Sequence, residues 1–372
     1  MKKVGITGQA GFIGTHLYNH LGLQPEEYVR IPFRDEYFQD PDVLDEFVSQ
    51  CDVIIHLAAL NRHNDPQTIY DTNLALVKKL ISALERTGSK PHILFSSSTQ
   101  EERDNVFGKS KREGREMLSG WAEKNNALFT GLIIPNVFGP FGNPYYNSVV
   151  ATFCHQVTHN EQPRIEIDAL LRLIYIDELA KTILKAIQEG YHINGYRVAH
   201  TSEHKVSDIL NIINRFKSEY FDNGLFPQLN DSFETNLFNT FRCYMDIKSI
   251  NPVALKMNTD NRGTFVETVK TELGGQVSFS TTKPGITRGN HFHTRKIERF
   301  AVIKGKARIQ LRRIGTDEVL NFDLDGNEPS YVDMPVWYTH NITNTGSDEL
   351  YTLFWINEFF DPADPDTYFE VV

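Results

Sequence analysis

Short apolar runs alternate with longer amphipathic stretches through the first 150 residues. The apolar runs cover residues 3–7, 52–59 and 92–96, and apolar positions at helical spacing cover residues 68–86 between the second and third runs. Strands of a parallel sheet are buried on both faces, so they form nearly continuous apolar runs. The alternation of strand and helix predicts a doubly wound α/β domain of the Rossmann type.

The pattern changes near residue 257 to short runs in which apolar and polar residues alternate. Alternation with a period of two is typical of strands that bury one face. Turns rich in glycine, asparagine and aspartate separate these runs, which predicts a small all-β antiparallel barrel built from two sheets. The expected strands cover residues 276–280, 298–303, 307–312, 331–333 and 350–356.

The chain of 372 residues is longer than a single core usually allows. The segment 222–241 is rich in asparagine, aspartate, glycine and proline, and we expect it to connect two domains. We therefore predict a first domain of residues 1–245 and a second domain of residues 246–372.

Composition argues against several classes of partner. A net charge of −10 disfavours nucleic acid and anionic membranes. No apolar run reaches the roughly 20 residues that span a bilayer, and a strand begins so close to residue 1 that we expect no signal peptide. Three scattered cysteines cannot build a disulfide framework. We expect a cytoplasmic protein that acts on small molecules.

A glycine-rich loop joins the first strand to the first helix. It contains Gly8, Gly11 and Gly14, with Phe12 and Ile13 at the start of the helical pattern. Glycines let the backbone turn sharply and approach a pyrophosphate, and the helix N-terminus offers free N–H groups to the anion. Because a strand precedes the loop and a helix follows it, the loop predicts a dinucleotide site.

The end of the second strand indicates which dinucleotide binds. No acidic residue stands there before Asp35, whereas Arg34 does, with Arg30 as a second choice. An acidic side chain would bind the adenosine ribose of NAD, and arginine suits the 2′-phosphate of NADP. Arg34 therefore favours NADPH, although a solvated surface arginine is the alternative.

Two further strand ends complete the predicted cofactor edge. The strand that ends at His56 is followed by Leu57, Ala58 and Ala59, which are compact enough for backbone to lie against a flat ligand, and residues 96–99 end the next strand in hydroxyls. Together with the glycine loop, these segments resemble the extended short-chain dehydrogenase/reductase (SDR) family. The resemblance implies a catalytic set of a Ser or Thr, a Tyr and a Lys, the last two spaced as YxxxK.

The matching segment departs from that set at one position. Lys111 fits the lysine, and Ser98 or Thr99 fits the hydroxyl, but Phe107 occupies the tyrosine position and cannot donate a proton. Three interpretations stay open. Another group delivers the proton, such as Thr99, a tyrosine at 145 or 146, or water; or the domain binds its ligands without reducing them; or the chain carries an altered residue.

The same resemblance extends downstream. Asn136 lies in the loop that packs on the nicotinamide side in that family. Tyr146 and Asn147 begin the region where a nucleotide sugar is placed, and Arg172 is a modest candidate for pairing with its diphosphate.

A histidine-rich segment organises the second domain. His291 and His293 are two residues apart, so on one strand both imidazoles face the same side. Glu298 and His340 follow on expected neighbouring strands. Three histidines and a carboxylate form a common shell for zinc or another divalent metal, although the histidines can also act as acid or base without metal. The pattern resembles the cupin family, except that Trp337 stands where that family usually has glycine.

Three longer strings identify the whole chain as similar to one family. They cover residues 145–154, 283–291 and 361–369, and resemble the bifunctional capsular polysaccharide biosynthesis enzymes of the UDP-N-acetyl-L-fucosamine pathway, the CapF type. The resemblance implies that the cupin domain inverts C3 of a UDP-2-acetamido-2,6-dideoxy-4-hexulose. The SDR domain then reduces the C4 ketone with NADPH to a UDP-2-acetamido-2,6-dideoxy-L-talose.

The resemblance also implies zinc in the cupin domain and a homodimer. Lys296, Tyr338 and the histidines are the candidate acids and bases for epimerisation. Two alternatives stay open: a C3 epimerase or ketoisomerase that has lost reduction because of Phe107, and a nucleotide-sugar or NADP-binding protein without activity.

Overall fold

The computed structural model describes residues 1–372, which form two compact units. The first contains Met1–Thr152 and Ile167–Val206, and the second contains Phe153–Glu166 and Ser207–Val372. The domain boundary expected after residue 245 falls inside the second compact unit, and it stays a prediction.

A six-stranded parallel sheet forms the centre of the first unit, in the order β2-β1-β3-β4-β5-β8. The chain runs from β1 outward to β2 and then returns to β3 on the other side of β1, so the strand order reverses between β1 and β3. Ligands of doubly wound sheets bind at such a reversal, beyond the carboxyl ends of the strands. The strands are β1 (Lys2–Thr7), β2 (Tyr28–Ile31), β3 (Val53–His56), β4 (His92–Ser98), β5 (Phe129–Ile134) and β8 (Ile193–Arg197).

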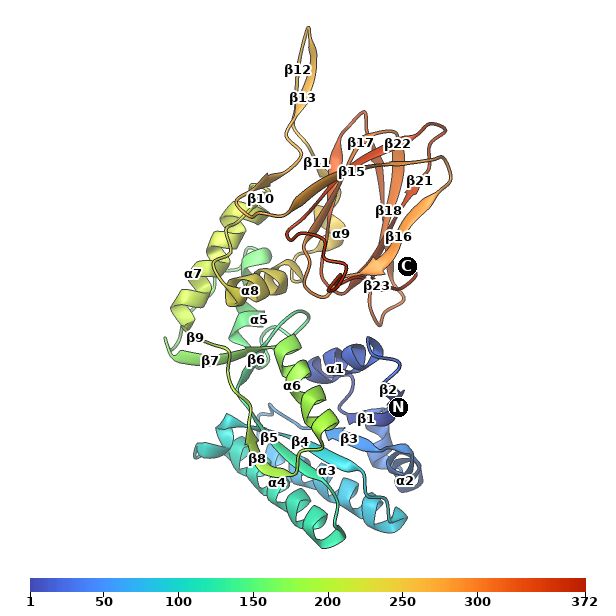
Figure 1. Ribbon diagram of the computed structural model, residues 1–372. Helices are drawn as coiled ribbons and strands as arrows, with labels where there is room; N and C mark the ends of the chain where they lie inside the picture. The colour runs from blue at the N-terminus through green and yellow to red at the C-terminus, as the bar shows by residue number, and fades with distance from the viewer. The chain divides into compact units, whose positions relative to one another are not determined.

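Helices cover both faces of this sheet, which confirms the predicted Rossmann-type architecture (Figure 1). On one face, α2 (Pro41–Gln50), α3 (Pro66–Thr87) and α4 (Val106–Asn125) share a hydrophobic cluster with β3, β4 and β5. On the other face, α1 (Phe12–Gly22) contacts α6 (Ile176–Glu189).

Sequence signals explain the limits of α3. Asp65 accepts a hydrogen bond from the Gln67 N–H, and Pro66 occupies the first turn, where its missing N–H costs nothing. Gly88 ends the helix in the left-handed conformation, at φ +68°.

A smaller three-stranded sheet completes the first unit. It has the order β6-β7-β9, with β6 (Asn136–Phe138), β7 (Leu170–Tyr175) and β9 (Ser202–Lys205). Helix α5 (Val149–Thr158) and the 3₁₀ turns η1 (Asp35–Gln39) and η2 (Thr99–Glu102) lie in the connections.

Two five-stranded antiparallel sheets dominate the second unit, as the alternating pattern predicted. Their orders are β11-β20-β17-β22-β15 and β19-β18-β21-β16-β23. Buried apolar residues from both sheets, with Ile247, form one core cluster. The strands are β11 (Val253–Ala254), β15 (Gln276–Thr282), β16 (Thr287–Phe292), β17 (Glu298–Lys304), β18 (Lys306–Arg313), β19 (Val319–Asp325), β20 (Ser330–Met334), β21 (Tyr338–Asn344), β22 (Leu350–Ile356) and β23 (Tyr368–Phe369).

Helices precede these sheets in the chain. The segment expected to be a connection contains α8 (Ser232–Arg242), whose N-cap Asp231 accepts from the Glu234 N–H. The expected connection is therefore correct only for the turn-forming residues that flank α8. Within α8, the apolar positions have helical spacing and are buried. The other elements are α7 (Val206–Phe216), the π-helical turn η3 (Lys217–Phe221), α9 (Ile247–Ile250), and the pairs β10–β14 (Leu225–Phe226, Lys270–Thr271) and β12–β13 (Met257–Asp260, Gly263–Val266).

No helix of the structure combines the length and the apolar character that crossing a membrane requires.

Two arginine–aspartate pairs lie on neighbouring strands of the second unit in different surroundings. Arg299 of β17 donates two hydrogen bonds to Asp333 of β20, at 2.7 and 2.8 Å, and both side chains are almost fully buried. Arg308 and Asp323 make the same two-fold contact at 2.8 and 3.0 Å, but about half of each side chain or more is exposed.

We expect Asp333→Asn to destabilise the second unit by roughly 3–5 kcal/mol, because it leaves the Arg299 charge buried without its counter-ion. Asp323→Asn is the matched control, and its cost should stay below about 1 kcal/mol since water solvates Arg308. Urea denaturation followed by tryptophan fluorescence measures both, because Trp337 and Trp355 are buried in this unit. Equal losses in the two variants would contradict the importance of burial.

Candidate functional site

The glycine loop lies between β1 and α1, at the point where the strand order reverses. The Gly11 N–H donates to the Gly8 carbonyl at 3.1 Å, and Gly11 is also the N-cap of α1, with no side chain bonded to the first helical N–H groups. The N-terminus of α1 is therefore open to an anion, as a pyrophosphate site requires.

Close backbone contacts explain the glycines of this loop. A Cβ atom on Gly14 would lie 2.3 Å from the Gly8 carbonyl oxygen, and one on Gly8 would lie 2.8 Å from the Ala58 nitrogen. Gly8 also has a φ of +70°, which glycine adopts without strain. The first contact holds the loop against α1, and the second brings it against Leu57–Ala59, so the structure gathers these predicted cofactor residues.

Arg34 and Arg30 differ in their surroundings. The Phe33 N–H donates to the Gln9 side chain at 3.0 Å, which ties the end of β2 to the glycine loop, and Arg34 follows directly as an exposed side chain. Arg30 instead stacks over Tyr18 at 4.5 Å. Arg34 is thus the better placed of the two for a phosphate near the loop.

Lys111 is buried in α4, one helical turn after Phe107. Its Nζ donates to the Ser96 hydroxyl at 3.4 Å and lies 4.7 Å from the Phe95 ring centroid and 6.0 Å from that of Phe107. Burial lowers the pKa of Lys111 from 10.5 to about 8. The half-buried Phe107 therefore occupies the position beside the lysine, without a hydroxyl.

The predicted hydroxyl residues lie at the start of η2. Ser98 accepts from the Gln100 N–H at 3.2 Å, so it caps this turn while its own proton stays available. A Cβ atom on Gly108 would lie 2.0 Å from the Gln100 carbonyl oxygen. This close packing brings η2, which begins at Thr99, against the start of α4 near Phe107.

Two polar residues to which the sequence analysis assigned no site role support this edge. Ser96 is the hydroxyl that contacts Lys111, and Asn73 accepts from the Leu60 N–H at 2.7 Å and donates to Ser110 at 3.0 Å. Asn73 thereby joins the loop after β3 to α4. A polar residue in the apolar stripe of the 68–86 helix was the signal that could have identified Asn73.

The residues predicted to bind the nucleotide sugar are exposed. Arg172 pairs with Glu203 at 2.7 Å, and its carbonyl accepts at 3.2 Å from the amide of Asn136, the residue predicted for the nicotinamide side of the cofactor. Tyr146 and Asn147 lie in the loop before α5 and are exposed. Arg172 must exchange Glu203 for a diphosphate if it binds one.

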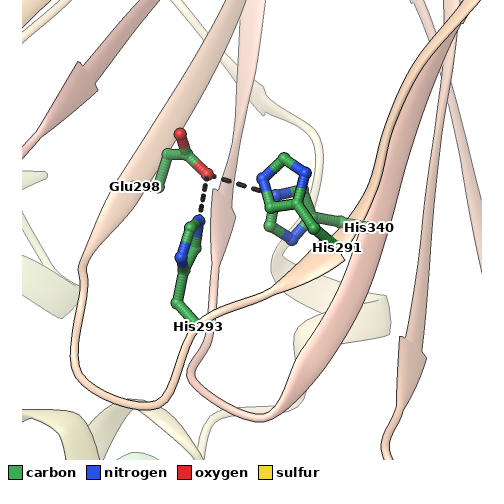
Figure 2. A group of neighbouring side chains, drawn as sticks. All are labelled: His291, His293, Glu298 and His340. Carbon is green, nitrogen blue, oxygen red and sulfur yellow. Dashed lines mark hydrogen bonds and ion pairs between the residues drawn. The ribbon is translucent and has the colours of Figure 1, made fainter. Parts of the chain in front are cut away.

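Three histidines and one glutamate meet inside the second unit (Figure 2). His291 is on β16, directly opposite His340 on β21, and Glu298 begins β17. The Glu298 carboxylate lies 3.2 Å from His293 Nε2 and 3.1 Å from His340 Nε2. One ligand atom from each of the four residues lies within 4.8 Å of the others. The sequence prediction of this group is confirmed as a spatial cluster.

The titration of the cluster follows from burial and mutual contact. Burial, with the neighbouring histidines, lowers the pKa of His291 to about 4, so this imidazole is neutral near pH 7. Burial opposes charge on His293, but its hydrogen bond to the Glu298 carboxylate, with the contacts to Asp366, outweighs burial and raises the pKa of His293. Burial likewise opposes the charge of Glu298, whose pKa its two histidine partners nevertheless lower. A buried carboxylate among three imidazoles is a donor set that fits a divalent metal.

A tight turn before β21 positions His340. Trp337 is buried with a φ of +62°, a region that favours glycine. The Trp337 N–H donates to the His293 carbonyl at 2.8 Å, and its ring stacks on Phe292 at 5.6 Å. These contacts hold the strained turn, so the tryptophan replaces the usual glycine without loss of the cluster.

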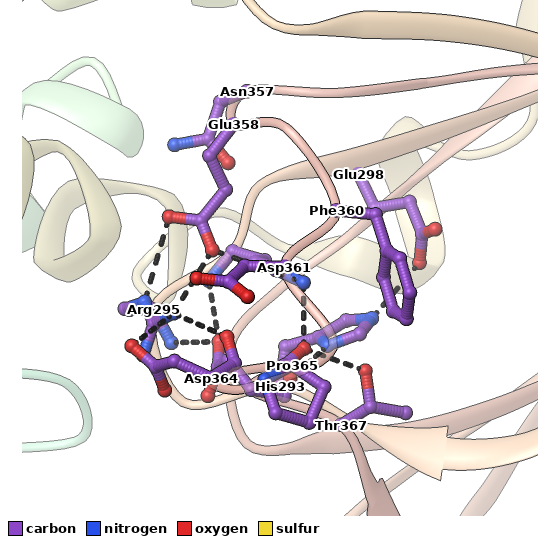
Figure 3. A network of polar contacts seen from close by, with 12 residues as sticks. His293, Arg295, Glu298, Asn357, Glu358, Phe360, Asp361, Asp364, Pro365 and Thr367 are labelled. Carbon is purple, nitrogen blue, oxygen red and sulfur yellow. Dashed lines mark hydrogen bonds and ion pairs between the residues drawn. The ribbon is translucent and has the colours of Figure 1, made fainter.

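The C-terminal segment holds the loop between β16 and β17 (Figure 3). The Asp366 carboxylate accepts from the backbone N–H groups of Thr294, Arg295 and Lys296, each at 3.0 Å, and its carbonyl bonds His293 Nδ1. Such a second bond fixes the orientation of a ligating imidazole. The sequence string 361–369 contained Asp366, but nothing in it indicated this contact.

The two acid and base candidates have different environments. Lys296 is buried, and its Nζ donates to the Pro365 carbonyl at 2.6 Å and lies 3.8 Å from Glu358. Tyr338 is half-buried, lies two residues before His340 on β21 and so shares its face, and burial raises the pKa of the Tyr338 hydroxyl. Lys296 thus contacts the C-terminal segment, and both roles stay predictions.

Comparisons with known proteins agree with this geometry. The family described as NAD dependent epimerase/dehydratase matches residues 4–199, and the polysaccharide biosynthesis C-terminal domain matches residues 258–368. The chain is 34% identical over 369 residues to the UDP-2-acetamido-2,6-beta-L-arabino-hexul-4-ose reductase of Pseudomonas aeruginosa, with 98% of each chain covered.

Solved structures match as well. The capsular polysaccharide assembling protein CapF of Staphylococcus aureus is 34% identical, with a TM-score of 0.63 and 100% of each chain covered. CapF with the inhibitor 3-isopropenyl-tropolone is 32% identical, with a TM-score of 0.58 and the same coverage. The resemblance stated from the sequence is confirmed. The chain is an enzyme of the NAD dependent epimerase/dehydratase family that carries a polysaccharide biosynthesis C-terminal domain.

Proposed function

We propose that the protein is a bifunctional nucleotide-sugar enzyme that epimerises C3 and reduces C4 of a UDP-2-acetamido-2,6-dideoxy-4-hexulose. The observation that carries this proposal is the presence of two different sites on one chain. The first unit has an open helix N-terminus and the buried Lys111, and the second has the cluster of three histidines and Glu298. The reductase named among the relatives supports the substrate class.

Epimerisation must precede reduction because it depends on the ketone. A carbonyl at C4 acidifies the C3 proton, so a base can remove it, and reprotonation from the opposite face inverts the centre. His291 is the half-exposed member of the cluster and is neutral near pH 7. It is therefore able either to accept a proton or to act as a metal ligand.

The cluster supplies the ligands for a divalent metal, which we propose to be zinc. His291, His293, Glu298 and His340 would hold it, and when bound it would stabilise negative charge on the sugar oxygens. Asp366 would keep His293 in position through the Nδ1 contact.

Reduction would take place at the edge of the parallel sheet. We propose NADPH as the cofactor, which supplies a hydride to C4, with its phosphates at the glycine loop and its 2′-phosphate at Arg34. Lys111 would bind the nicotinamide ribose and favour transfer of a proton to the C4 oxygen. Phe107 cannot provide that proton, so Thr99, Tyr145, Tyr146 or water would deliver it. The product would be a UDP-2-acetamido-2,6-dideoxy-L-talose.

Phe107 also supports a second candidate function, a C3 epimerase or ketoisomerase without reductase activity. In that case wild-type protein would not oxidise NADPH, and Phe107→Tyr would introduce oxidation by restoring the hydroxyl beside Lys111. The homodimer, which the family resemblance implies, and the cytoplasmic location, which the composition favours, remain further proposals.

The two activities should separate by mutation. We expect Glu298→Gln to lower C3 exchange by at least about 100-fold and to remove bound metal, because the buried charge that holds the ligands is lost. NADPH oxidation should persist with a substrate already inverted at C3. Deuterium incorporation by NMR, cofactor absorbance and metal content by mass spectrometry measure the three effects.

Glu328→Gln is the matched control, because Glu328 is exposed on the turn between β19 and β20 and lies outside the cluster. Undiminished C3 exchange in Glu298→Gln would rule out the cluster as the epimerisation site.

Lys111→Met should abolish NADPH oxidation and leave C3 exchange intact. It should also raise the free energy of unfolding of the apoprotein at pH 7 by on the order of 1–3 kcal/mol, because a charge whose burial is unfavourable is removed. Between pH 8 and 10.5 the unfolded wild-type chain binds more protons at this lysine than the folded chain, so stability rises with pH there.

Chemical denaturation between pH 7 and 10 checks the stability effect. In Lys111→Met, the part of the increase in unfolding free energy with pH that comes from this lysine should be absent. Lys78→Met, a change at an exposed lysine of α3, should keep the full increase. A Lys111→Met protein less stable than wild type at pH 7 would contradict the proposed cost of burying the ammonium group.

A further inference from the structure

The second unit contains a cavity of about 770 Å³. Residues from η3, the end of α8, α9, the segments 253–256 and 267–270, and the strands β17 and β20 line it. Neighbouring residues on a strand point to opposite faces. Glu298 belongs to the histidine cluster, and Arg299, the next residue on β17, lines the cavity. The cavity and the cluster therefore lie on opposite faces of the same sheet.

A buried arginine lines this cavity without a carboxylate partner. Only 3% of Arg242 is exposed. Its Nη2 donates to the Met334 carbonyl at 2.9 Å and its Nε donates to the Tyr220 hydroxyl at 3.3 Å, while Nη1 has no hydrogen-bond partner. A buried charge is costly unless an opposite charge compensates it. Arg242 thus has unused capacity to bind an anion.

The buried carboxylate that lines the cavity is already shared. Asp333 accepts two hydrogen bonds from Arg299 and one from Tyr220, at 2.7 Å. Arg299 and Asp333 therefore neutralise one another, and no carboxylate of the protein forms an ion pair with Arg242.

Among the other charged residues of the cavity wall, one more cation has no counter-ion. Asp222 pairs with Lys217 at 2.7 Å, and Glu267 pairs with Lys270 at 3.2 Å. Lys256 also lines the cavity, is exposed, and has no ion pair. Once each carboxylate is matched with its own cation, Arg242 and Lys256 are the two positive charges left over.

We propose that this cavity is a binding site for a small metabolite through its oxyanion, a phosphate or a carboxylate group. Arg242 would bind the oxyanion at the buried end, because a guanidinium offers planar N–H donors that match two oxygens. Lys256 would add a second charge at the exposed wall. The volume lies within the range of small-molecule sites, about 300–1,000 Å³. This site is independent of the proposed epimerase and reductase activities.

Isothermal titration of the full-length protein with inorganic phosphate and, separately, with succinate tests the proposal. Saturating NADP⁺ is present throughout, so that the dinucleotide site is filled. We expect saturable binding of at least one anion, and the stronger of the two identifies a phosphate or a carboxylate as the natural group. Arg242→Met should weaken that binding at least about tenfold, since a charge-assisted hydrogen bond is lost.

Lys256→Gln should weaken the same binding several-fold and is not expected to disturb folding, because Lys256 is exposed. If circular dichroism shows that the Arg242→Met protein is unfolded, the affinity of Lys256→Gln tests the proposal instead. Lys283→Gln is the matched control, an exposed lysine outside the cavity that should bind the anion as wild type does. Absence of saturable binding by both anions, or wild-type affinity in Lys256→Gln and in folded Arg242→Met, would overturn the proposal.

Discussion

The buried carboxylate of Glu298 determines how the centre of the second unit is arranged. A carboxylate this far from water needs positive charge or several donors around it. His293, just after the end of β16, and His340 on β21 reach it at 3.2 and 3.1 Å. In the protein alone, the two imidazoles compensate the carboxylate through these contacts, and a divalent metal would add positive charge. The tryptophan turn before β21 and the Asp366 contact with His293 both keep these imidazoles where the carboxylate requires them.

The first unit is arranged around a different constraint: its backbone must come close to an anionic cofactor. Its glycine loop packs so closely on α1 and on the segment after β3 that side chains are excluded at residues 8 and 14. Lys111 is the buried cation beside this edge that the predicted chemistry uses. It has no carboxylate partner and contacts a hydroxyl and two aromatic rings. An unneutralised lysine is suited to a ligand with hydroxyl and phosphate groups, and it is less suited to a purely structural role.

The sequence predicted those parts of the structure that depend on local pattern. The parallel sheet, the antiparallel strands and the histidine cluster follow from spacing, because alternation decides which face a residue occupies. Contacts between segments far apart in the chain could not be predicted, because local spacing carries no information about them. Asp366 lies 70 to 72 residues from the backbone groups that it binds. Helix α8 was missed because its turn-rich flanks concealed the apolar face. Ser96 was not chosen as the catalytic hydroxyl because three further hydroxyl residues, Ser97, Ser98 and Thr99, follow it.

We propose that one chain performs both changes on the same sugar. The most direct test incubates wild-type protein with the UDP-2-acetamido-2,6-dideoxy-4-hexulose and unlabelled NADPH in D₂O, followed by NMR of the isolated product. We expect a single product with deuterium at C3, taken from solvent, and protium at C4, taken from the cofactor. A reduced product with protium at C3, or deuterated ketone without any reduction, would contradict it.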